Sequence, residues 1–218
     1  GAPSEARRAL LESFPDFRGL IELLDHCLSK YPAALTGTIA PISVLYPDGE
    51  ATLLEQAAAR TVAYSTREVY TRAVRDLLVR LAAGAPGRRL RVLEIGVGDG
   101  LLAGVTVPAL QALEIEYHAT DVGGAFVARA KRAAADGGFD CVRTGRLDIT
   151  QPTGPQGYEE GTFDAVVALD VFHATPQLQE TVAAAHRLLA PGGIAAIIET
   201  VAAPRWVHLI WGLTEAWW

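Results

Sequence analysis

The chain has 218 residues, half of them hydrophobic, with a formal net charge of −6 and a pI near 5.4. This acidic balance argues against nucleic acid as the main partner, and no apolar run is long enough to span a bilayer. Cys27 and Cys141 fit neither a disulfide framework nor a zinc motif. Because the N-terminus shows no signal-peptide pattern, we expect a cytoplasmic α/β protein with a small helical extension.

Helical periodicity dominates the first part of the chain. Apolar residues recur at three- and four-residue steps over residues 4–30, and Pro15 predicts a break between two helices. Residues 31–49 are irregular, and a second helical pattern covers 50–83. We therefore expect a helical cap subdomain over residues 1–84.

Strands alternate with helices over residues 85–218, which predicts a nucleotide-binding core with a parallel sheet and helices on both faces. Pro191-Gly192-Gly193 is expected to end the last of these helices. We expect strands at 90–95, 114–120, 140–144, 163–169 and 194–198, and helices at 101–113, 123–135 and 176–190.

Residues 94–100 read Glu-Ile-Gly-Val-Gly-Asp-Gly and lie between a predicted strand and a predicted helix. Glycine lets the backbone turn sharply and lets a ligand lie against it, so this arrangement favours nucleotide binding. A dinucleotide fingerprint would need a glycine at position 101, where this chain has Leu101. From this stretch alone, a glycine turn that only closes the strand is the alternative.

Two acids follow the next two predicted strands. Asp121 lies where an acid hydrogen-bonds ribose hydroxyls in doubly wound sheets, with a helix N-cap as the alternative. Asp148 follows the third predicted strand, and its alternative is a solvated loop carboxylate. Both positions favour a ligand site at the carboxyl edge of the sheet.

Several motifs resemble one known family. The E-x-G-x-G-x-G pattern of residues 94–100 resembles motif I of class I S-adenosylmethionine (SAM) methyltransferases. More specific motifs are Leu35-Thr36-Gly37, Val44-Leu45-Tyr46-Pro47-Asp48-Gly49, Phe163-Asp164-Ala165-Val166-Val167-Ala168-Leu169-Asp170-Val171-Phe172-His173-Ala174-Thr175, Leu188-Leu189-Ala190-Pro191-Gly192-Gly193, Ile198-Glu199-Thr200 and the closing residues 210–218. They are similar to the C-methyltransferase domains of modular polyketide synthases, over nearly the whole chain.

The resemblance implies a class I methyltransferase (Rossmann-like) fold behind an N-terminal helical lid, with SAM as cofactor and S-adenosylhomocysteine as product. Asp148 would meet the adenine amino group. Asp170 replaces the family's usual Asn, and its carboxylate would hold the ammonium group of SAM or alter the acceptor pocket. No metal is expected. The cofactor-binding residues are expected to be Glu94, Gly96, Gly98, Gly100, Asp121, Asp148, Ile149 and Asp170.

The chain departs from the family at its C-terminal end. A class I methyltransferase sheet normally ends in an antiparallel hairpin after its fifth strand, and no residues remain here to form one. We expect a C-terminally truncated core, in which strand 194–198 is an exposed edge or is covered by the segment after Pro204.

His173 and Glu199 are the expected catalytic residues. They follow neighbouring predicted strands, and the resemblance implies that they form a base dyad in which the carboxylate orients the imidazole. A capping histidine and a solvated carboxylate are the separate alternatives. The dyad would deprotonate the α-carbon of a β-ketoacyl thioester, and the resulting enolate would attack the methyl group of SAM.

The resemblance also implies partners, namely an acyl carrier protein bearing the substrate on phosphopantetheine and the neighbouring synthase domains. Nucleic acid and membranes are not expected as partners. Two alternatives stay open: an O-methyltransferase of the same fold, and a non-catalytic pseudo-methyltransferase that acts as a structural or docking domain. The presence of the glycine loop, His173 and Glu199 favours catalysis.

Overall fold

A computed structural model describes residues 3–47, 52–61, 66–85, 87–202 and 205–214. The chain forms two compact units, one of residues 1–68 with 201–218 and one of residues 69–200. Within the described residues, no helix combines the length and apolar character that crossing a bilayer requires. Asp48, Gly49, Pro204, Trp217 and Trp218, which several expectations involve, lie outside the described residues.

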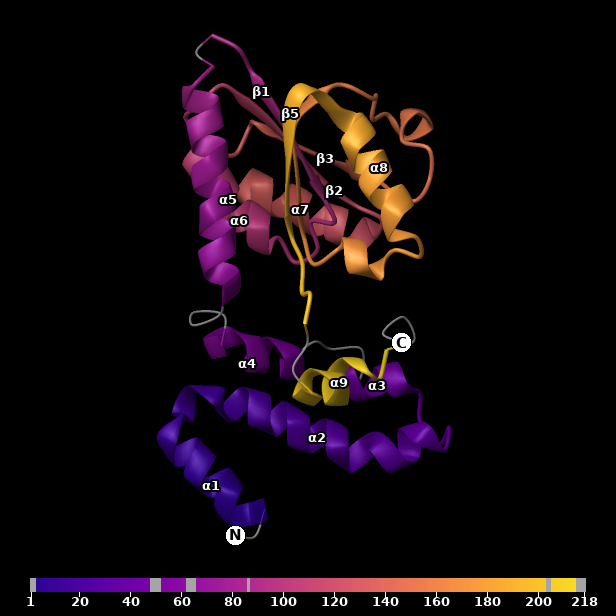
Figure 1. Cartoon of the computed structure of the whole chain (residues 1–218). Coiled ribbons are helices and arrows are strands. Elements are labelled where there is room, and N and C mark those ends of the chain that lie inside the picture. The colour runs from indigo at the N-terminus through magenta and orange to yellow at the C-terminus, as the bar shows by residue number, and fades with distance from the viewer. Residues whose placement is uncertain (1–2, 48–51, 62–65, 86, 203–204, 215–218) are drawn as a thin grey trace. The chain divides into compact units, whose positions relative to one another are not determined.

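The second unit contains a five-stranded sheet in which every pairing is parallel (Figure 1). This confirms the α/β class and the predicted number of strands. The strand order is β3-β2-β1-β4-β5. The strands are β1 (Leu90–Ile95), β2 (Ile115–Asp121), β3 (Val142–Arg146), β4 (Phe163–Leu169) and β5 (Leu189–Ile198).

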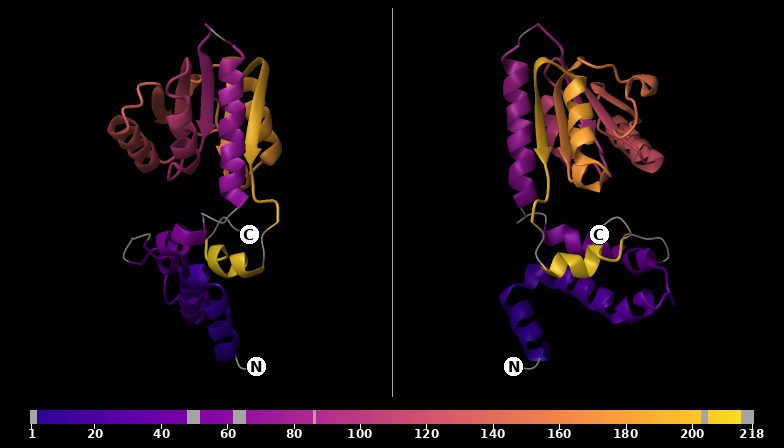
Figure 2. Two further views of the ribbon diagram at one scale, coloured as in Figure 1. Left: turned by 90° about the vertical axis from the view of Figure 1, so that its left-hand side faces the viewer. Right: turned by 45° about the vertical axis from the view of Figure 1, so that its right-hand side comes forward.

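Helices cover both faces of this sheet, as Figures 1 and 2 show. The face covered by α5, α6 and α7 buries Val92 and Tyr117, and the opposite face buries Leu93 against α8. Because successive strand residues point to opposite faces, Glu94 shares its face with Val92. The helices are α5 (Thr66–Ala83), α6 (Leu101–Leu110), α7 (Gly124–Asp136) and α8 (Leu178–Leu188), with short 3₁₀ helices η4 (Gly154–Gln156) and η5 (Phe172–Ala174).

Strand β5 begins earlier than the sequence pattern suggested. Phe163 pairs with Leu189 and Ala165 pairs with Ile194, so the Pro-Gly-Gly segment forms an irregularity inside the strand instead of a separate terminator. Gly192 permits this with a φ of 79°. At Gly193 an added Cβ would lie 3.0 Å from the carbonyl oxygen of Phe163, so only glycine allows this close backbone approach.

The two edge strands differ in character. β3 carries Arg143 and Arg146, both exposed, and charged side chains on an edge discourage pairing with another chain. β5 carries no charge, none of its residues is buried, and Ile197 is 36% exposed. The expected exposed edge at the fifth strand is therefore present in the described part of the chain.

The first unit is helical and has its own core. Leu23 and Cys27 of α2 are buried together with Val44, Leu45 and residues of the C-terminal segment. The break expected at Pro15 is confirmed, since a 3₁₀ turn separates α1 from α2. The helices are α1 (Pro3–Ser13), η1 (Pro15–Phe17), α2 (Arg18–Leu35), α3 (Pro41–Leu45), α4 (Thr52–Thr61) and α9 (Arg205–Trp211).

Residues 31–49 are more helical than the sequence indicated. α2 continues through Pro32 to Leu35, because the proline lies in the last turn, where the packing of Ala34 outweighs one missing hydrogen bond. α3 begins with Pro41, a residue well suited to the first turn of a helix. The irregular stretch predicted from the proline pattern was therefore wrong over these two helices.

The compact units also divide at positions that differ from the expected boundary near residue 84. Val74 and Leu78 of α5 are buried in the core beneath the sheet, so this helix belongs largely to the second unit. Ile210 and Leu213 are buried beside α2, so residues 201–218 belong to the first unit. Both assignments follow from where the apolar side chains of these segments are buried.

Candidate active site

The three glycines after β1 all have positive φ, but their surroundings differ. At Gly98 (51°) and Gly100 (82°) an added Cβ would meet no atom within 4 Å. At Gly96 (71°) it would lie 2.4 Å from a methyl carbon of Val171, in the turn after β4. Gly98 and Gly100 therefore leave open space in front of the loop, whereas Gly96 lets the loop pack against a neighbouring turn.

Asp121 holds the glycine loop from the end of β2. One carboxylate oxygen accepts the N–H of Gly98 at 3.0 Å, and the other accepts the N–H of Gly123 at 2.7 Å. The residue is only 7% exposed. Asp121 thus joins the loop to the turn before α7, whose N-cap is Gly123 and not Asp121. Its contact with ribose stays a prediction.

Glu94 lies under the loop, almost fully buried. Its carboxyl group accepts a hydrogen bond of 3.0 Å from the Tyr117 hydroxyl, and this bond and the backbone N–H of Ala103 in the first turn of α6 both act to lower its pKa. Burial raises the pKa of Glu94 to about 8. Burial is also the main cause that raises the pKa of Tyr117 well above its usual value, and the neighbouring Glu94 raises it further. Glu94 therefore connects the end of β1 to β2, and a direct contact with the cofactor stays a prediction.

The expected adenine residues lie after β3. Asp148 accepts two hydrogen bonds from Thr150, at 2.9 Å to the backbone N–H and 2.6 Å to the hydroxyl. It borders a hollow of about 440 Å3 together with Val122, Arg146 and Gln156. Ile149 is buried in the core against α8 instead of lining this hollow. Asp148 is thus placed near the segment that follows Asp121, and the cofactor contacts of both residues remain untested.

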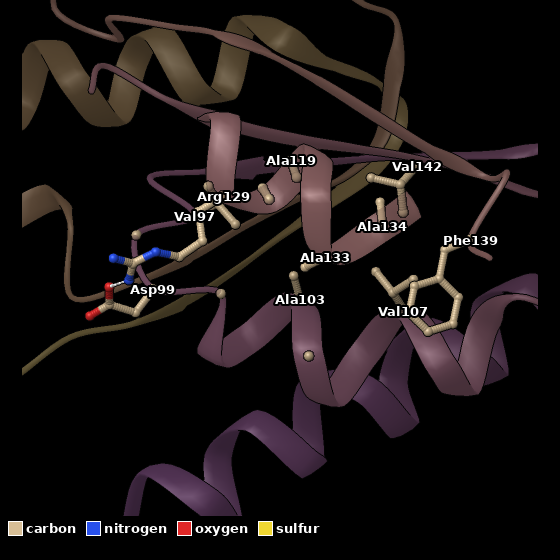
Figure 3. A pocket seen from close by; sticks show the side chains of 14 residues that line it. Val97, Asp99, Ala103, Val107, Ala119, Arg129, Ala133, Ala134, Phe139 and Val142 are labelled. Atoms are coloured by element: carbon tan, nitrogen blue, oxygen red, sulfur yellow. Dashed lines mark hydrogen bonds and ion pairs between the residues drawn. The ribbon is translucent and has the colours of Figure 1, made fainter. Parts of the chain in front are cut away.

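A cavity of about 110 Å3 lies between α6 and α7 and borders the glycine loop at Gly98, Asp99 and Gly100 (Figure 3). Alanine and valine side chains and Phe139 form most of its wall, and an ion pair between Asp99 and Arg129 lies at one end. Few polar side chains line this cavity, whereas a nucleoside needs hydrogen-bond partners. We therefore expect the nucleoside of the cofactor at the carboxyl edge of the sheet, where Asp121 and Asp148 supply polar groups.

His173 and Glu199 lie together at the ends of β4 and β5. Imidazole Nδ1 and carboxylate Oε2 are 2.6 Å apart, and the carboxylate can only accept, so Nδ1 is the donor; in the neutral imidazole the lone pair is then on Nε2. Glu199 Oε1 accepts the backbone N–H groups of Val171 (2.8 Å) and Phe172 (2.6 Å). The histidine side chain is 45% exposed and that of the glutamate 19%. The structure thus brings together the two residues expected to act as a pair.

Asp170 lies beside this pair, directly after β4. Its carboxylate Oδ1 accepts the backbone N–H of Thr200 at 3.0 Å and the Thr200 hydroxyl at 2.9 Å. Potential metal-binding atoms of Asp170, His173 and Glu199 lie within 4.8 Å of one another. However, a 2.6 Å separation is a hydrogen-bond distance, too short for two atoms that bind one metal ion, and Glu199 Oε1 already accepts two N–H groups. The expectation that no metal is used stays a prediction.

Three residues of the site were missed from the sequence. Tyr117 bonds Glu94, Val171 packs against Gly96, and Thr200 bonds Asp170. Tyr117 lies on the same face of the sheet as Glu94, which strand periodicity could have indicated once β1 and β2 were paired. Nothing in the local sequence marks the other two, because their partners come from different strand ends.

Comparison with known proteins identifies the family. A family model described as a methyltransferase domain matches residues 93–195. The polyketide synthase ThaQ of Burkholderia thailandensis is 34% identical over 209 residues, which is 91% of this chain and 10% of ThaQ. The solved structure of the CurJ carbon methyltransferase is 32% identical with a TM-score of 0.82 and covers all of this chain.

The chain belongs to the methyltransferase domains of polyketide synthases. The trans-methyltransferase CalH, solved in complex with S-adenosylhomocysteine, is 29% identical with a TM-score of 0.74 over 98% of the chain. The chain spans 57% of the solved CurJ chain and 58% of that of CalH.

The residues of this methyltransferase domain fit SAM, the methyl donor of its class. Open space in front of Gly98 and Gly100 leaves the loop backbone accessible to a ligand, and Asp121 places a carboxylate beside it. Such a loop followed by a helix N-terminus is typical of nucleotide sites in open parallel sheets.

Proposed function

We propose that this methyltransferase domain transfers a methyl group from SAM to the α-carbon of a β-ketoacyl thioester in polyketide biosynthesis. The observation that carries the proposal is the 2.6 Å contact between His173 and Glu199 at the carboxyl ends of adjacent parallel strands. This is the edge of an open α/β sheet at which ligands bind. The names of CurJ and of the polyketide synthase ThaQ support carbon as the acceptor and polyketides as the product class.

His173 is the proposed general base. With Nδ1 donating to Glu199, the lone pair on Nε2 is available to accept the α-proton. The negative charge of Glu199 stabilises the imidazolium that forms, and the N–H groups of Val171 and Phe172 hold the carboxylate in place. When bound, SAM supplies an electrophilic methyl group. The proton leaves His173 to solvent after transfer.

The strength of an imidazole base determines which acceptor can react. The α-carbon of a β-ketoacyl thioester lies between two carbonyl groups, so its proton is acidic enough for an imidazole. A saturated acyl thioester lacks the second carbonyl and should not react. We propose that the thioester arrives on the phosphopantetheine arm of an acyl carrier protein, within a synthase that holds both domains.

Replacement of the proposed general base tests the proposal. We expect His173→Ala to lower the rate of methyl transfer to a β-ketoacyl carrier-protein thioester by about 10²- to 10⁴-fold or more. SAM affinity, measured by calorimetry, should stay close to that of the wild type, because the imidazole is assigned to the acceptor. Glu199→Gln should lose less, since an amide oxygen can still accept from Nδ1.

Mass spectrometry of the carrier protein provides the readout, and tandem spectra locate the methyl group. Normal turnover by the His173→Ala variant would contradict the base assignment. A methyl group on oxygen would favour the O-methyltransferase alternative, and SAM binding without turnover in the wild type would favour a docking role.

A further inference from the structure

The segment after β4 has an unusual backbone at Asp170. This is the only non-glycine residue of the described part of the chain with a positive φ, which is 52°. An L-residue in the left-handed region is sterically strained and persists where surrounding contacts offset the strain, and aspartate tolerates it better than most residues. The contacts present at Asp170 therefore indicate what this conformation serves.

Asp170 connects the end of β4 to the end of β5 through three hydrogen bonds. Its backbone N–H donates to the carbonyl of Ile198 at 2.8 Å. Its carboxylate accepts the N–H and the hydroxyl of Thr200. These partners lie on either side of Glu199 in the sequence, so Asp170 fixes the backbone before and after the carboxylate that binds His173.

Glu199 makes the reciprocal connection. Its side chain extends from the end of β5 to the N–H groups of Val171 and Phe172, the two residues that follow Asp170. The carboxylate of Asp170 thus reaches from the end of β4 to the end of β5, and that of Glu199 reaches from the end of β5 to the residues after β4. We call these five residues, Asp170, Val171, Phe172, Glu199 and Thr200, the carboxylate clasp. The imidazole of His173 is held by the one remaining oxygen of Glu199.

We propose that Asp170 is a positioning residue that sets the geometry of the His173–Glu199 pair, an inference that rests on the function proposed above. The left-handed turn at Asp170 directs the next two N–H groups toward Glu199, and the bonds to Thr200 hold Glu199 at the same strand end. In the described part of the chain β5 pairs with β4 alone, so the contacts of Asp170 add to the strand pairing that holds its end. A misplacement of about 1 Å costs on the order of 10²-fold in rate, so the clasp matters for catalysis.

Four variants separate the contributions of the clasp. Asp170→Asn keeps an oxygen acceptor and tolerates the left-handed region. Asp170→Gly keeps the backbone conformation and removes the acceptor. Thr200→Val removes only the hydroxyl donor. Glu160→Ala, which removes an exposed carboxylate paired with Arg187 away from the clasp, is the control.

Two measurements are made on each variant of the full chain. One is kcat and KM for methyl transfer. The other is amide hydrogen exchange at residues 171 and 172, which does not depend on activity. We expect Asp170→Gly to lower kcat by about 10- to 100-fold with KM for SAM little changed, and to speed exchange at both amides. Thr200→Val and Asp170→Asn should show smaller changes of the same kind, because each keeps part of the hydrogen bonding, and Glu160→Ala should resemble the wild type.

The outcomes distinguish this proposal from the proposed function. Wild-type kcat and exchange in Asp170→Gly would overturn the positioning role while leaving the His173 assignment standing. Equal losses in Asp170→Asn and Asp170→Gly with unchanged exchange would also overturn it, because charge and not position would then matter. If the wild type transfers no methyl group, faster exchange in Asp170→Gly than in Asp170→Asn would still support the clasp.

Discussion

Gly98 and Asp121 define the side of the glycine loop on which we expect SAM to bind. Asp121→Ala should weaken SAM binding by about 1.5–3 kcal/mol, as the loss of hydrogen bonds to a charged group does. Gly98→Val should weaken it further, because its side chain would fill the open space in front of the loop. Isothermal titration calorimetry gives both affinities.

Gly138→Val is the matched control for the glycine. Gly138 also has a positive φ, 65°, and open space where a Cβ would lie, but it belongs to the turn between α7 and β3. Both valine variants should lose similar stability from backbone strain. If the two bind SAM equally well, the cofactor does not lie over Gly98.

Glu94 should make stability depend on pH. Its folded-state pKa of about 8 lies above the ordinary glutamate value of 4.5, so between these values the folded protein keeps a proton that the unfolded chain releases. Stability should therefore fall as pH rises through this window, with a slope of up to about 1.4 kcal/mol per pH unit. Above about pH 8 the slope from this group should vanish.

Glu94→Gln removes this titration and keeps a side chain of similar size. We expect the difference in melting temperature, variant minus wild type, to increase between pH 5 and pH 8. Differential scanning fluorimetry in a series of buffers measures it. A constant difference across this range would show that Glu94 is already ionised in the folded protein at the lower end.

At the scale of single elements, the backbone of β5 requires glycine at position 193, whereas α6 does not require glycine at position 104. Gly193→Ala would place a Cβ 2.9 to 3.1 Å from three backbone oxygens, so it should destabilise the protein by about 1–3 kcal/mol. Gly104→Ala, inside α6 where a Cβ meets nothing within 4 Å, should stabilise it by about 0.5–1 kcal/mol. Urea denaturation followed by circular dichroism reports both. Equal stabilities would contradict the irregular start of β5.

At the scale of the whole molecule, ligand binding should distinguish the nucleotide classes. A ligand that binds only the native state stabilises it by about 2.7 kcal/mol at a concentration 100 times its Kd. SAM and S-adenosylhomocysteine should therefore raise the melting temperature, whereas NAD should not, because Leu101 replaces the third glycine of a dinucleotide fingerprint. A shift with NAD but not with SAM would contradict the cofactor assignment.

Features that are determined within a single element could be predicted from the sequence. The bounds of β1 and β4 match the prediction, because short segments rich in apolar residues and bounded by polar or glycine residues indicate buried parallel strands. The glycine loop and Asp121 at the end of β2 could be proposed from the sequence, since a nucleotide site places its residues at fixed offsets along the chain, and their cofactor contacts stay predictions. His173 and Glu199 were found through their motifs, which also lie within single segments.

Other features needed the tertiary structure, because they depend on which segments meet. Nothing local shows that Gly96 packs against Val171, while Gly98 faces open space. The bonds from Asp170 to Thr200 join two strand ends, and the burial of residues such as Ile210 assigns the C-terminal segment to the helical unit. Sequence periodicity reports which residues are apolar, but packing alone decides which surface each of them covers.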